Sequence, residues 1–217
     1  MQNPLLTEIE SRFGRGAVQR LSDLASVGVV STTLPQLDTA LCIGGLPQKH
    51  MSVIVSTGTS GAATLAYRIA AQQQNVGELT ALLDTKHTFD PDYAARCGLQ
   101  LQQMMVVRGK HDRALETVHR VLSHVSLLII SELLPLSGRL RHDITRSNAA
   151  VVMLSSGEVP ADAAVVIELQ HRAWIRHRRD IVGYQSRAVV RKNRFAPAGQ
   201  TADFEIRFDG FVDGDAL

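Results

Sequence analysis

The sequence predicts an α/β fold with a central, mostly parallel sheet that is flanked by helices and extended by antiparallel strands near the C-terminus. Two observations lead to this prediction. Up to residue 154, short runs of Val, Ile and Leu alternate with helical patterns, which is typical of parallel strands covered on both faces. After residue 160 the apolar runs follow one another with only short turns between them, which indicates antiparallel strands.

Strands and helices alternate in the first part of the chain, whose length suits one domain. The apolar runs of strand length are residues 51–55, 79–83, 104–107, 127–130 and 149–154. The helical patterns between them are residues 62–73, a stretch that begins near Pro91, residues 113–123 and residues 139–147. Further strands are expected at residues 165–169, 173–182, 185–190 and 202–208.

An amphipathic helix is expected near the N-terminus, within an arm that covers residues 1–30. Pro4 suits the first turn of that helix, and Leu6, Ile9 and Phe13 form its apolar stripe. An arm of this size cannot bury the stripe by itself, so it must pack on its own core or on a neighbouring subunit. In the second case these three residues are a candidate partner interface, and the arm is a route to oligomers.

Charge is distributed unevenly along the chain. The net charge of +2 is too small to indicate nucleic-acid binding by itself. However, residues 171–194 contain eight Lys or Arg residues and one acid, Asp180, whereas the residues that follow are mainly acidic. Alternation along strands would divide the basic side chains between two faces. The candidate DNA contacts in this stretch are Arg172, Arg176, Arg178 and Arg179.

The cysteine content and the hydropathy pattern narrow the class of protein. Cys42 and Cys97 are the only cysteines and show no metal-binding spacing, so we expect two reduced thiols in the core and no metal. No apolar run approaches the roughly 20 residues of a membrane span, and the N-terminus lacks a signal pattern. A cytoplasmic protein is therefore expected.

Several segments resemble the bacterial RecA recombinases. Residues 9–18 resemble the arm with which a family member packs on the adjacent protomer of a filament, and residues 34–47 resemble the approach to the nucleotide loop. Residues 83–94 resemble the segment that carries the catalytic glutamate and the adenine contacts, and residues 189–206 resemble the end of the core. The resemblance implies a RecA-like P-loop NTPase fold for residues 31–217, without the family's C-terminal domain.

The nucleotide loop that this resemblance implies lacks most of its functional residues. A P-loop has the pattern GxxxxGK[ST], in which backbone amides wrap the phosphates, the lysine neutralises them and the hydroxyl holds Mg²⁺. The matching residues 56–63 keep only Gly61. Ser56 replaces the first glycine, Ala62 the lysine and Ala63 the hydroxyl residue.

Three further positions of the implied site have changed. Lys86 stands where the family has the glutamate that activates water, Ser131 where it has the acid associated with Mg²⁺, and Ser156 where it has the glutamine that senses the γ-phosphate. Phosphoryl transfer depends on positioning and electrostatics, so these losses together predict that the protein is not an enzyme. No cofactor is expected, although weak binding of ATP or ADP stays open. The nearby Asp84 and His87 are expected to be structural.

Four residues match functional positions of the family. Asp90 and Tyr93 match the adenine contacts, with a helix cap and a packed tyrosine as the alternative. Lys192 and Arg194 match cations that reach across to the ATP of the neighbouring subunit, with a solvated basic strand edge as the alternative. The sharper interpretation is that the chain presents cations to a partner's nucleotide although its own site is degenerate.

The DNA-binding loops of the family are short in this chain. Only residues 157–163 separate Ser156 from the next predicted strand, where RecA has a long loop that contacts single-stranded DNA. Residues 135–141 leave little room for the second loop. We therefore expect any DNA binding to be weak, non-specific and sensitive to salt.

These expectations favour a non-catalytic relative of RecA that acts in DNA repair and the SOS response through protein contacts. Such a protein resembles the ImuA group, RecA-like proteins with reduced ATPase features that are encoded with error-prone polymerase components. The expected partner is RecA or a translesion polymerase complex. The alternatives are a RecA-like DNA-binding recombination protein with weak nucleotide binding, and a recombinase with residual ATP-dependent activity.

Overall fold

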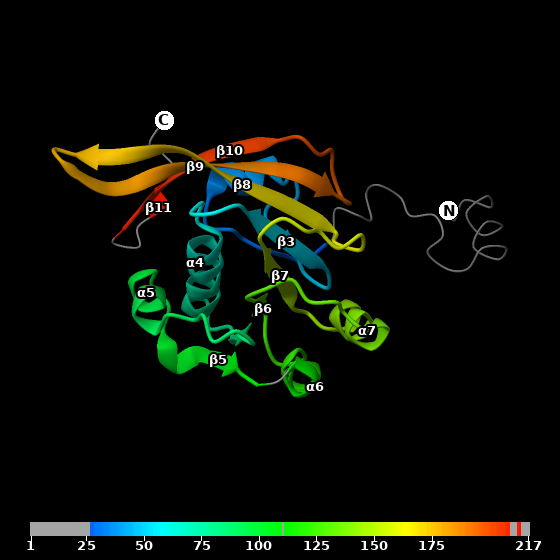
Figure 1. Ribbon diagram of the computed structural model, residues 1–217. Helices are drawn as coiled ribbons and strands as arrows, with labels where there is room; N and C mark the ends of the chain where they lie inside the picture. Colours follow the sequence, from blue (N-terminus) through cyan, green and yellow to red (C-terminus); the bar gives the residue numbers. More distant parts are fainter. Residues whose placement is uncertain (1–26, 110, 209–211, 214–217) are drawn as a thin grey trace, which may run out of the picture.

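The computed structural model describes residues 27–109, 111–208 and 212–213, so the predicted interface residues Leu6, Ile9 and Phe13 lie outside the described part of the chain. The described residues form an α/β fold around a nine-stranded sheet with the order β11-β10-β9-β8-β3-β7-β6-β4-β5 (Figure 1). A separate pair of short antiparallel strands, β1 (Val29–Val30) and β2 (Leu46–Pro47), joins the end of the predicted arm to the core.

Six neighbouring strands of the large sheet run parallel, and three antiparallel strands follow at one edge. The parallel strands are β3 (Met51–Ser56), β4 (Thr80–Leu83), β5 (Met104–Val107), β6 (Leu127–Ile130), β7 (Ala150–Ser155) and β8 (Val165–His177). The antiparallel strands are β9 (Asp180–Asn193), β10 (Thr201–Arg207) and β11 (Val212–Asp213). The predicted fold class is confirmed by this topology.

Helices cover both faces of the parallel strands, because the side chains of these strands are apolar on both faces. One face carries α3 (Pro35–Ala40), α4 (Ala62–Asn75) and α5 (Pro91–Arg96), and a 3₁₀ turn (Leu101–Gln103) precedes β5. The other face carries α6 (His111–Val121) and α7 (Gly138–Arg146), so that α4 and α7 lie on opposite sides of β6 and β7 (Figure 1). No helix in the described ranges is long and apolar enough to cross a membrane.

Two apolar clusters, one on each face, hold these layers together. Leu65 of α4 packs in one cluster with Ile54 and Leu82 of the sheet. Leu140 of α7 packs in the other with Val53 and neighbouring strand residues. Fully burying side chains of this size contributes about 1.5–3 kcal/mol each, which makes the two clusters the main source of stability.

The free cysteines divide between core and surface. Cys97 is buried in the cluster beneath α4, as predicted. Cys42 is exposed, so the expectation of two core thiols was wrong for this residue. It follows the end of α3 with a φ of 60°, in a turn that carries its side chain away from the sheet.

The first strands match their predicted bounds to within a residue at each end, whereas the C-terminal strands do not. Four strands were predicted between residues 165 and 208, but the chain forms two long strands, β8 and β9, followed by β10. The predicted break after residue 169 is a β-bulge, with a register shift between His171 and Ala173. The true turn is Arg178–Arg179, which the sequence does not signal because hairpin turns favour Gly, Asn and Asp.

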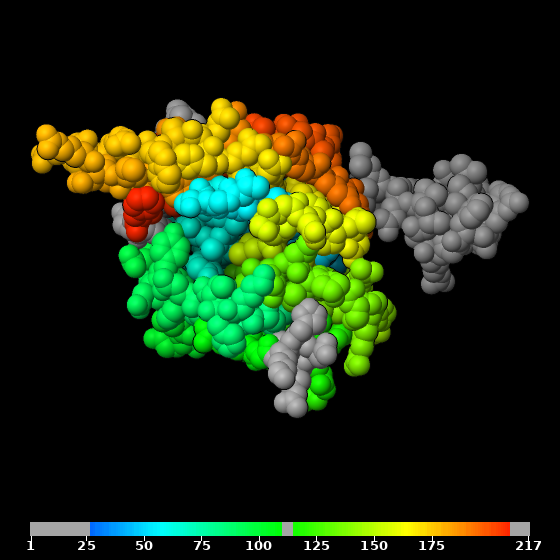
Figure 2. Space-filling view, in the orientation of Figure 1, coloured from blue at the N-terminus to red at the C-terminus, as the bar shows by residue number. Residues whose placement is uncertain are grey.

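The β8–β9 hairpin extends beyond the rest of the sheet. β8 pairs with β3 only over Val165–Leu169, and β10 pairs with β9 only from Gly183 onward along β9. Within the part of the chain that the structure describes, the far end of the hairpin therefore has no third strand beside it. In the space-filling view this end stands clear of the body (Figure 2).

Gly183 lies inside β9, where the sequence predicted a break between two strands. A Cβ atom at this position would lie 2.3 Å from the carbonyl oxygen of Ile206 and 3.0 Å from Cα of Arg207. The contacts are with backbone atoms of β10, which cannot rotate away. Glycine at this position therefore permits the close approach of β9 and β10 rather than ending a strand.

We expect Gly183→Ala to lower the free energy of unfolding by about 1–3 kcal/mol, because the added methyl group must push β10 away from β9. Urea unfolding followed by circular dichroism measures this change. Gly157→Ala is the matched control, because a Cβ at Gly157 meets no atom within 4 Å. Equal stability of the two variants would contradict the described packing of β9 against β10.

Candidate functional site

A cleft of about 590 Å³ opens at the carboxyl ends of the parallel strands β3, β4, β6 and β7. Ligands of open α/β sheets bind at this edge, where successive connections leave the sheet in opposite directions. The strand order provides such a point, because β3 lies between β7 and β8 while the chain continues from β3 to β4 further across the sheet. The whole predicted degenerate nucleotide site lines the cleft: Ser56, Gly61, Ala62, Ala63, Lys86, Ser131 and Ser156.

The loop between β3 and α4 is held by hydroxyl groups. The Oγ atoms of Ser56 and Ser60 lie 2.5 Å apart, and Ser186 Oγ of β9 donates to the carbonyl oxygen of Ser60 at 2.7 Å. Gly61 has a φ of +94°, and a Cβ there would lie 2.0 Å from Cδ1 of Ile206. A left-handed backbone and a close contact both require glycine, so the fold itself explains why Gly61 is kept.

One ion pair dominates the charge inside the cleft. Lys86 Nζ lies 2.6 Å from Oε2 of Glu132, and Thr85 Oγ1 donates to the other carboxylate oxygen of the same residue. Among the described residues that line the cleft, Lys86 is the only cation and Glu132 the only acid. Sequence analysis did not single out Glu132, although an acid directly after Ser131 was a signal. The ends of β4 and β6 are thus joined by a pair with no net charge.

The two residues that match adenine contacts have structural partners. Asp90 is the N-cap of α5, and its carboxylate accepts the backbone N–H of Tyr93 at 3.0 Å. The Tyr93 hydroxyl lies 2.6 Å from Oγ1 of Thr64 on α4. Burial raises the pKa of Tyr93, so the phenol stays protonated at neutral pH. These contacts correspond to the helix cap and packed tyrosine named as the alternative.

Lys192 and Arg194 lie at the amino ends of the parallel strands, whereas the cleft opens at their carboxyl ends. The Lys192 ammonium donates to the carbonyl oxygen of Ala161 at 2.8 Å. Arg194 is exposed and lines a small pocket of about 160 Å³. This pocket lies beside the residues that precede β3, together with the ion pair of Arg141 and Asp162, whose atoms are 2.7 Å apart. The two cations are therefore far from the cleft of their own chain.

The basic C-terminal stretch is divided, as strand alternation predicted. Arg187 makes a two-pronged hydrogen bond to Asp203 at 2.6 and 2.7 Å, and Arg172 lines the same surface pocket. The candidate contacts Arg176, Arg178 and Arg179 lie instead at the far end of the hairpin. These five arginines thus do not form one continuous face.

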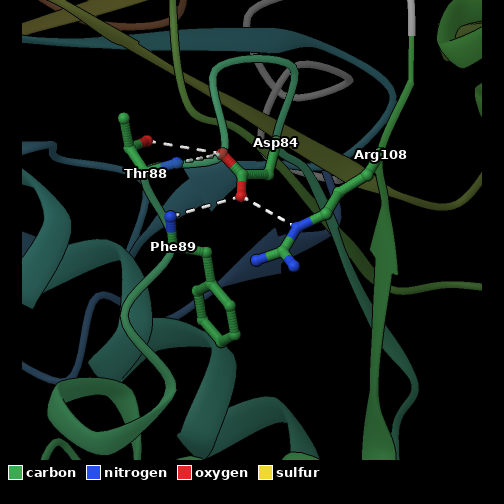
Figure 3. Close-up of polar contacts among 4 residues, drawn as sticks. All are labelled: Asp84, Thr88, Phe89 and Arg108. Carbon is green, nitrogen blue, oxygen red and sulfur yellow. Dashed lines mark hydrogen bonds and ion pairs between the residues drawn. The ribbon is translucent and has the colours of Figure 1, made fainter.

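Asp84 organises the loop that carries Lys86 over the cleft (Figure 3). Its buried carboxylate accepts the backbone N–H groups of Thr88 at 2.9 Å and Phe89 at 3.2 Å, and Nε–H of Arg108 at 3.2 Å. Burial opposes ionisation, but the two amide hydrogen bonds and Arg108 outweigh it and hold the pKa of Asp84 below its usual value. Asp84 is therefore structural, as predicted. The nearby His87 is exposed and has a φ of 56°.

We expect Asp84→Asn to destabilise the protein at neutral pH by about 1–3 kcal/mol, because the hydrogen-bond donors around the carboxylate lose their charged acceptor. The pKa of Asp84 is lowered on folding. Its stabilising contribution is therefore complete above the unfolded value of about 3.9 and is lost as the pH falls through the folded value.

Urea unfolding at a series of pH values measures this dependence. The stability difference between wild type and Asp84→Asn should shrink as the pH falls below about 4. The control Asp180→Asn changes an exposed carboxylate on the hairpin. A difference that is constant with pH would show that the charge of Asp84 does not stabilise this loop.

Comparisons with known proteins agree with this geometry. A family model of the RecA N-terminal domain matches residues 2–148. The chain is 28% identical to protein RecA of Methylococcus capsulatus over 94% of this chain and 73% of the relative. It is also 28% identical to protein RecA of Herpetosiphon aurantiacus, over 94% and 70% of the two chains.

The solved structure of the RadB recombinase has the same fold, with a TM-score of 0.68 at 16% identity, over 85% of this chain and 98% of that one. The match to the first RecA runs over 252 residues, more than the 217 of this whole chain, so that relative carries insertions within the shared core. The family match, the shared fold and the position of the cleft together show that the chain belongs to the RecA family.

Proposed function

We propose that this member of the RecA family is non-catalytic and acts in DNA repair and the SOS response through protein contacts. Its role would be to modulate RecA filaments or a translesion polymerase assembly, as in ImuA-like proteins. The observation that carries the proposal is the charge balance of the cleft, where Lys86 is neutralised by Glu132 at 2.6 Å.

A nucleoside triphosphate needs cations and a metal ligand, and the described residues that line this cleft offer one cation, Lys86, and one acid, Glu132, which are paired with each other. The positions that would supply the phosphate lysine and the Mg²⁺ hydroxyl are Ala62 and Ala63. Lys86 already has a carboxylate partner, and freeing it would leave Glu132 facing the phosphates as a like charge. Binding energy for a charged nucleotide is therefore small on electrostatic grounds.

The position that carries the water-activating base in the family holds no base in this chain. Lys86 occupies the position of the water-activating glutamate, and a protonated ammonium cannot accept a proton. Ser131, at the position of the metal-associated acid, has its Oγ buried without a hydrogen-bond partner in the described structure. These substitutions remove positioning and charge stabilisation together, the two terms on which phosphoryl transfer depends.

The edge of the sheet formed by β5 is available for contacts with another chain. β5 is the last strand at one edge and pairs only with β4 in the described residues. An unpaired edge strand is a template to which an extended segment of a second chain adds. The apolar side chain of Leu101 is exposed just before this strand.

We expect the purified protein to release no phosphate from Mg²⁺-ATP above a mock preparation, with or without single-stranded DNA. The reason is the combined loss at Ala62, Ala63, Lys86 and Ser131. If any phosphate release is measured, the variant Glu132→Gln tests whether it comes from the cleft. The control is Glu116→Gln, on the exposed surface of α6. Mg²⁺-dependent turnover that only Glu132→Gln alters would overturn the non-catalytic assignment, whereas turnover that neither variant alters is contamination.

We also expect substoichiometric amounts of this protein to change filament growth or the ATPase rate of RecA from the same organism. A subunit that joins a filament without binding ATP normally would cap it or weaken it locally. Phe13→Ala should reduce the effect, because it removes an apolar anchor worth about 2 kcal/mol or more.

Filament assembly and ATPase titrations against RecA provide the measurement. The control Val76→Ala removes an exposed apolar side chain elsewhere, at the end of α4. No change at equimolar protein, together with no co-purification, would exclude RecA as the direct partner and leave the polymerase assembly as the proposed one.

A further inference from the structure

Aromatic rings lie close together where the β8–β9 hairpin leaves the cleft. Trp174 of β8 lies opposite Tyr184 of β9, with ring centroids 5.9 Å apart, and the Tyr184 ring lies 6.4 Å from that of Phe208. Tyr184 and Phe208 also line the cleft, so the row of rings runs from the cleft onto the hairpin. Trp174 on the hairpin and Phe208 after β10 are each 46% exposed, whereas Tyr184 is buried at 4%.

The face of Trp174 continues toward the turn. Arg176 lies two residues beyond Trp174 on β8, and side chains two apart on a strand share a face. Ile181 is paired directly with Arg176 across the hairpin and is 39% exposed. The apolar row therefore gives way, at its outer end, to a surface where an aliphatic side chain lies beside a cation.

The charge of this outer end is unbalanced. Arg176, Arg178 and Arg179 are exposed and form no ion pair within the described residues, and the acid between the strands is Asp180 alone. Closer to the sheet, by contrast, Arg187 is paired with Asp203. The tip thus gathers three arginines that have no ion-pair partner within the described residues.

The turn itself carries a conformational cost. Arg178 has a φ of 55°, in the left-handed region that favours glycine, in a two-residue turn. A side chain in this region costs energy that a glycine would avoid. A glycine at this position would relieve that cost, so Arg178 does not stabilise the turn through its backbone conformation.

We propose that the surface made of the exposed side chains of Phe208, Trp174, Ile181 and Arg176, with the turn Arg178–Arg179, binds an acidic segment of another protein that carries an aromatic or leucine side chain. The acids of the segment would contact the arginines of the tip, and its apolar side chain would lie on Trp174. The proposal rests on the part of the proposed function that assigns this protein to contacts rather than catalysis.

The arrangement of charge favours a protein segment over a nucleic acid. A duplex phosphate backbone needs cations spaced along its path, whereas here the exposed rings of Trp174 and Phe208 lie between the arginines of the tip and the cleft. An aliphatic residue beside the arginines, Ile181, offers contact to an apolar side chain but no stacking surface for a base. Aromatic and arginine side chains together are typical of energetically dominant positions in protein interfaces.

The chain contains one tryptophan, Trp174, so intrinsic fluorescence reports directly on this surface. The probe is a synthetic peptide with a run of glutamates followed by leucine and phenylalanine, titrated into the full chain at fixed salt. We expect a saturable blue shift as Trp174 leaves water. A peptide with lysines for the glutamates should give no shift, and one with serines for the apolar residues should bind about tenfold more weakly.

The variant Arg178→Gly distinguishes an effect on peptide binding from an effect on the stability of the fold. It removes a cation and also relieves the left-handed backbone, so the variant should be at least as stable as wild type while its affinity for the acidic peptide falls about fivefold or more. Arg179→Gln should weaken binding similarly. Arg120→Gln, which removes an exposed cation from α6, is the control and should leave the affinity unchanged.

Three results would overturn the inference. They are the absence of a saturable shift with the acidic peptide, equal affinity for the lysine peptide, and tighter binding of an oligothymidylate than of the acidic peptide at the same salt. The last result would make the hairpin a nucleic-acid surface. If the peptide binds but the protein has no effect on RecA, only RecA as the partner in the proposed function is excluded. If the protein affects RecA but the peptide does not bind, only the inference about the hairpin is excluded.

Discussion

The burial of the parallel strands on both faces is the constraint on which the rest of the structure depends. β3, β4, β6 and β7 are apolar on both sides, so helices must cover both faces, and every connection must run over one edge or the other. The loops after these strands therefore meet at their carboxyl ends. This is why residues as far apart in the chain as Ser56, Lys86 and Ser156 line one cleft, whatever chemistry the cleft performs.

The cleft is held in shape by contacts within the protein. Gly61 is held by its backbone conformation and by its contact with Ile206, and the loop before it is closed by serine hydroxyls. The pair of Lys86 and Glu132 joins two strand ends from within the protein. Interactions of this kind keep loops in place without a ligand, which fits a protein whose proposed role is to present surfaces to partners.

The side chains of the hairpin are placed differently from those of the sheet, because the described far end of the hairpin lacks the tertiary contacts that fix the sheet. Only the register between β8 and β9 places its side chains, and the bulges in this pair turn Trp174 toward the face of Tyr184. Arginines nearer the sheet are neutralised by acids on neighbouring strands, as Arg187 is by Asp203. The position of a basic residue relative to the sheet edge thus decides whether its charge stabilises the fold or is available to a partner.

The sequence by itself determined the fold class and the alternating order of strands and helices, and it predicted which residues form the loop between β3 and α4. These follow from local apolar runs and from short motifs, and the strands at residues 104–107 and 127–130 have the predicted bounds because they are continuous apolar runs. The structural role of Asp84 was also predictable, since an acid at the end of a buried strand can accept the amides of the following loop.

Only the tertiary structure decided the rest. The partner of Lys86 lies 46 residues away in sequence, at Glu132, and no local pattern encodes a pairing between two strand ends. The long hairpin was predicted as separate strands, because a bulge near Arg172 resembles a break in the sequence, while the turn at Arg178–Arg179 lacks the residues that usually mark one. The distribution of charge along the sequence also did not predict which arginines would form ion pairs with acids. That depends on which strands lie side by side, and a strand pairing is a property of the folded sheet.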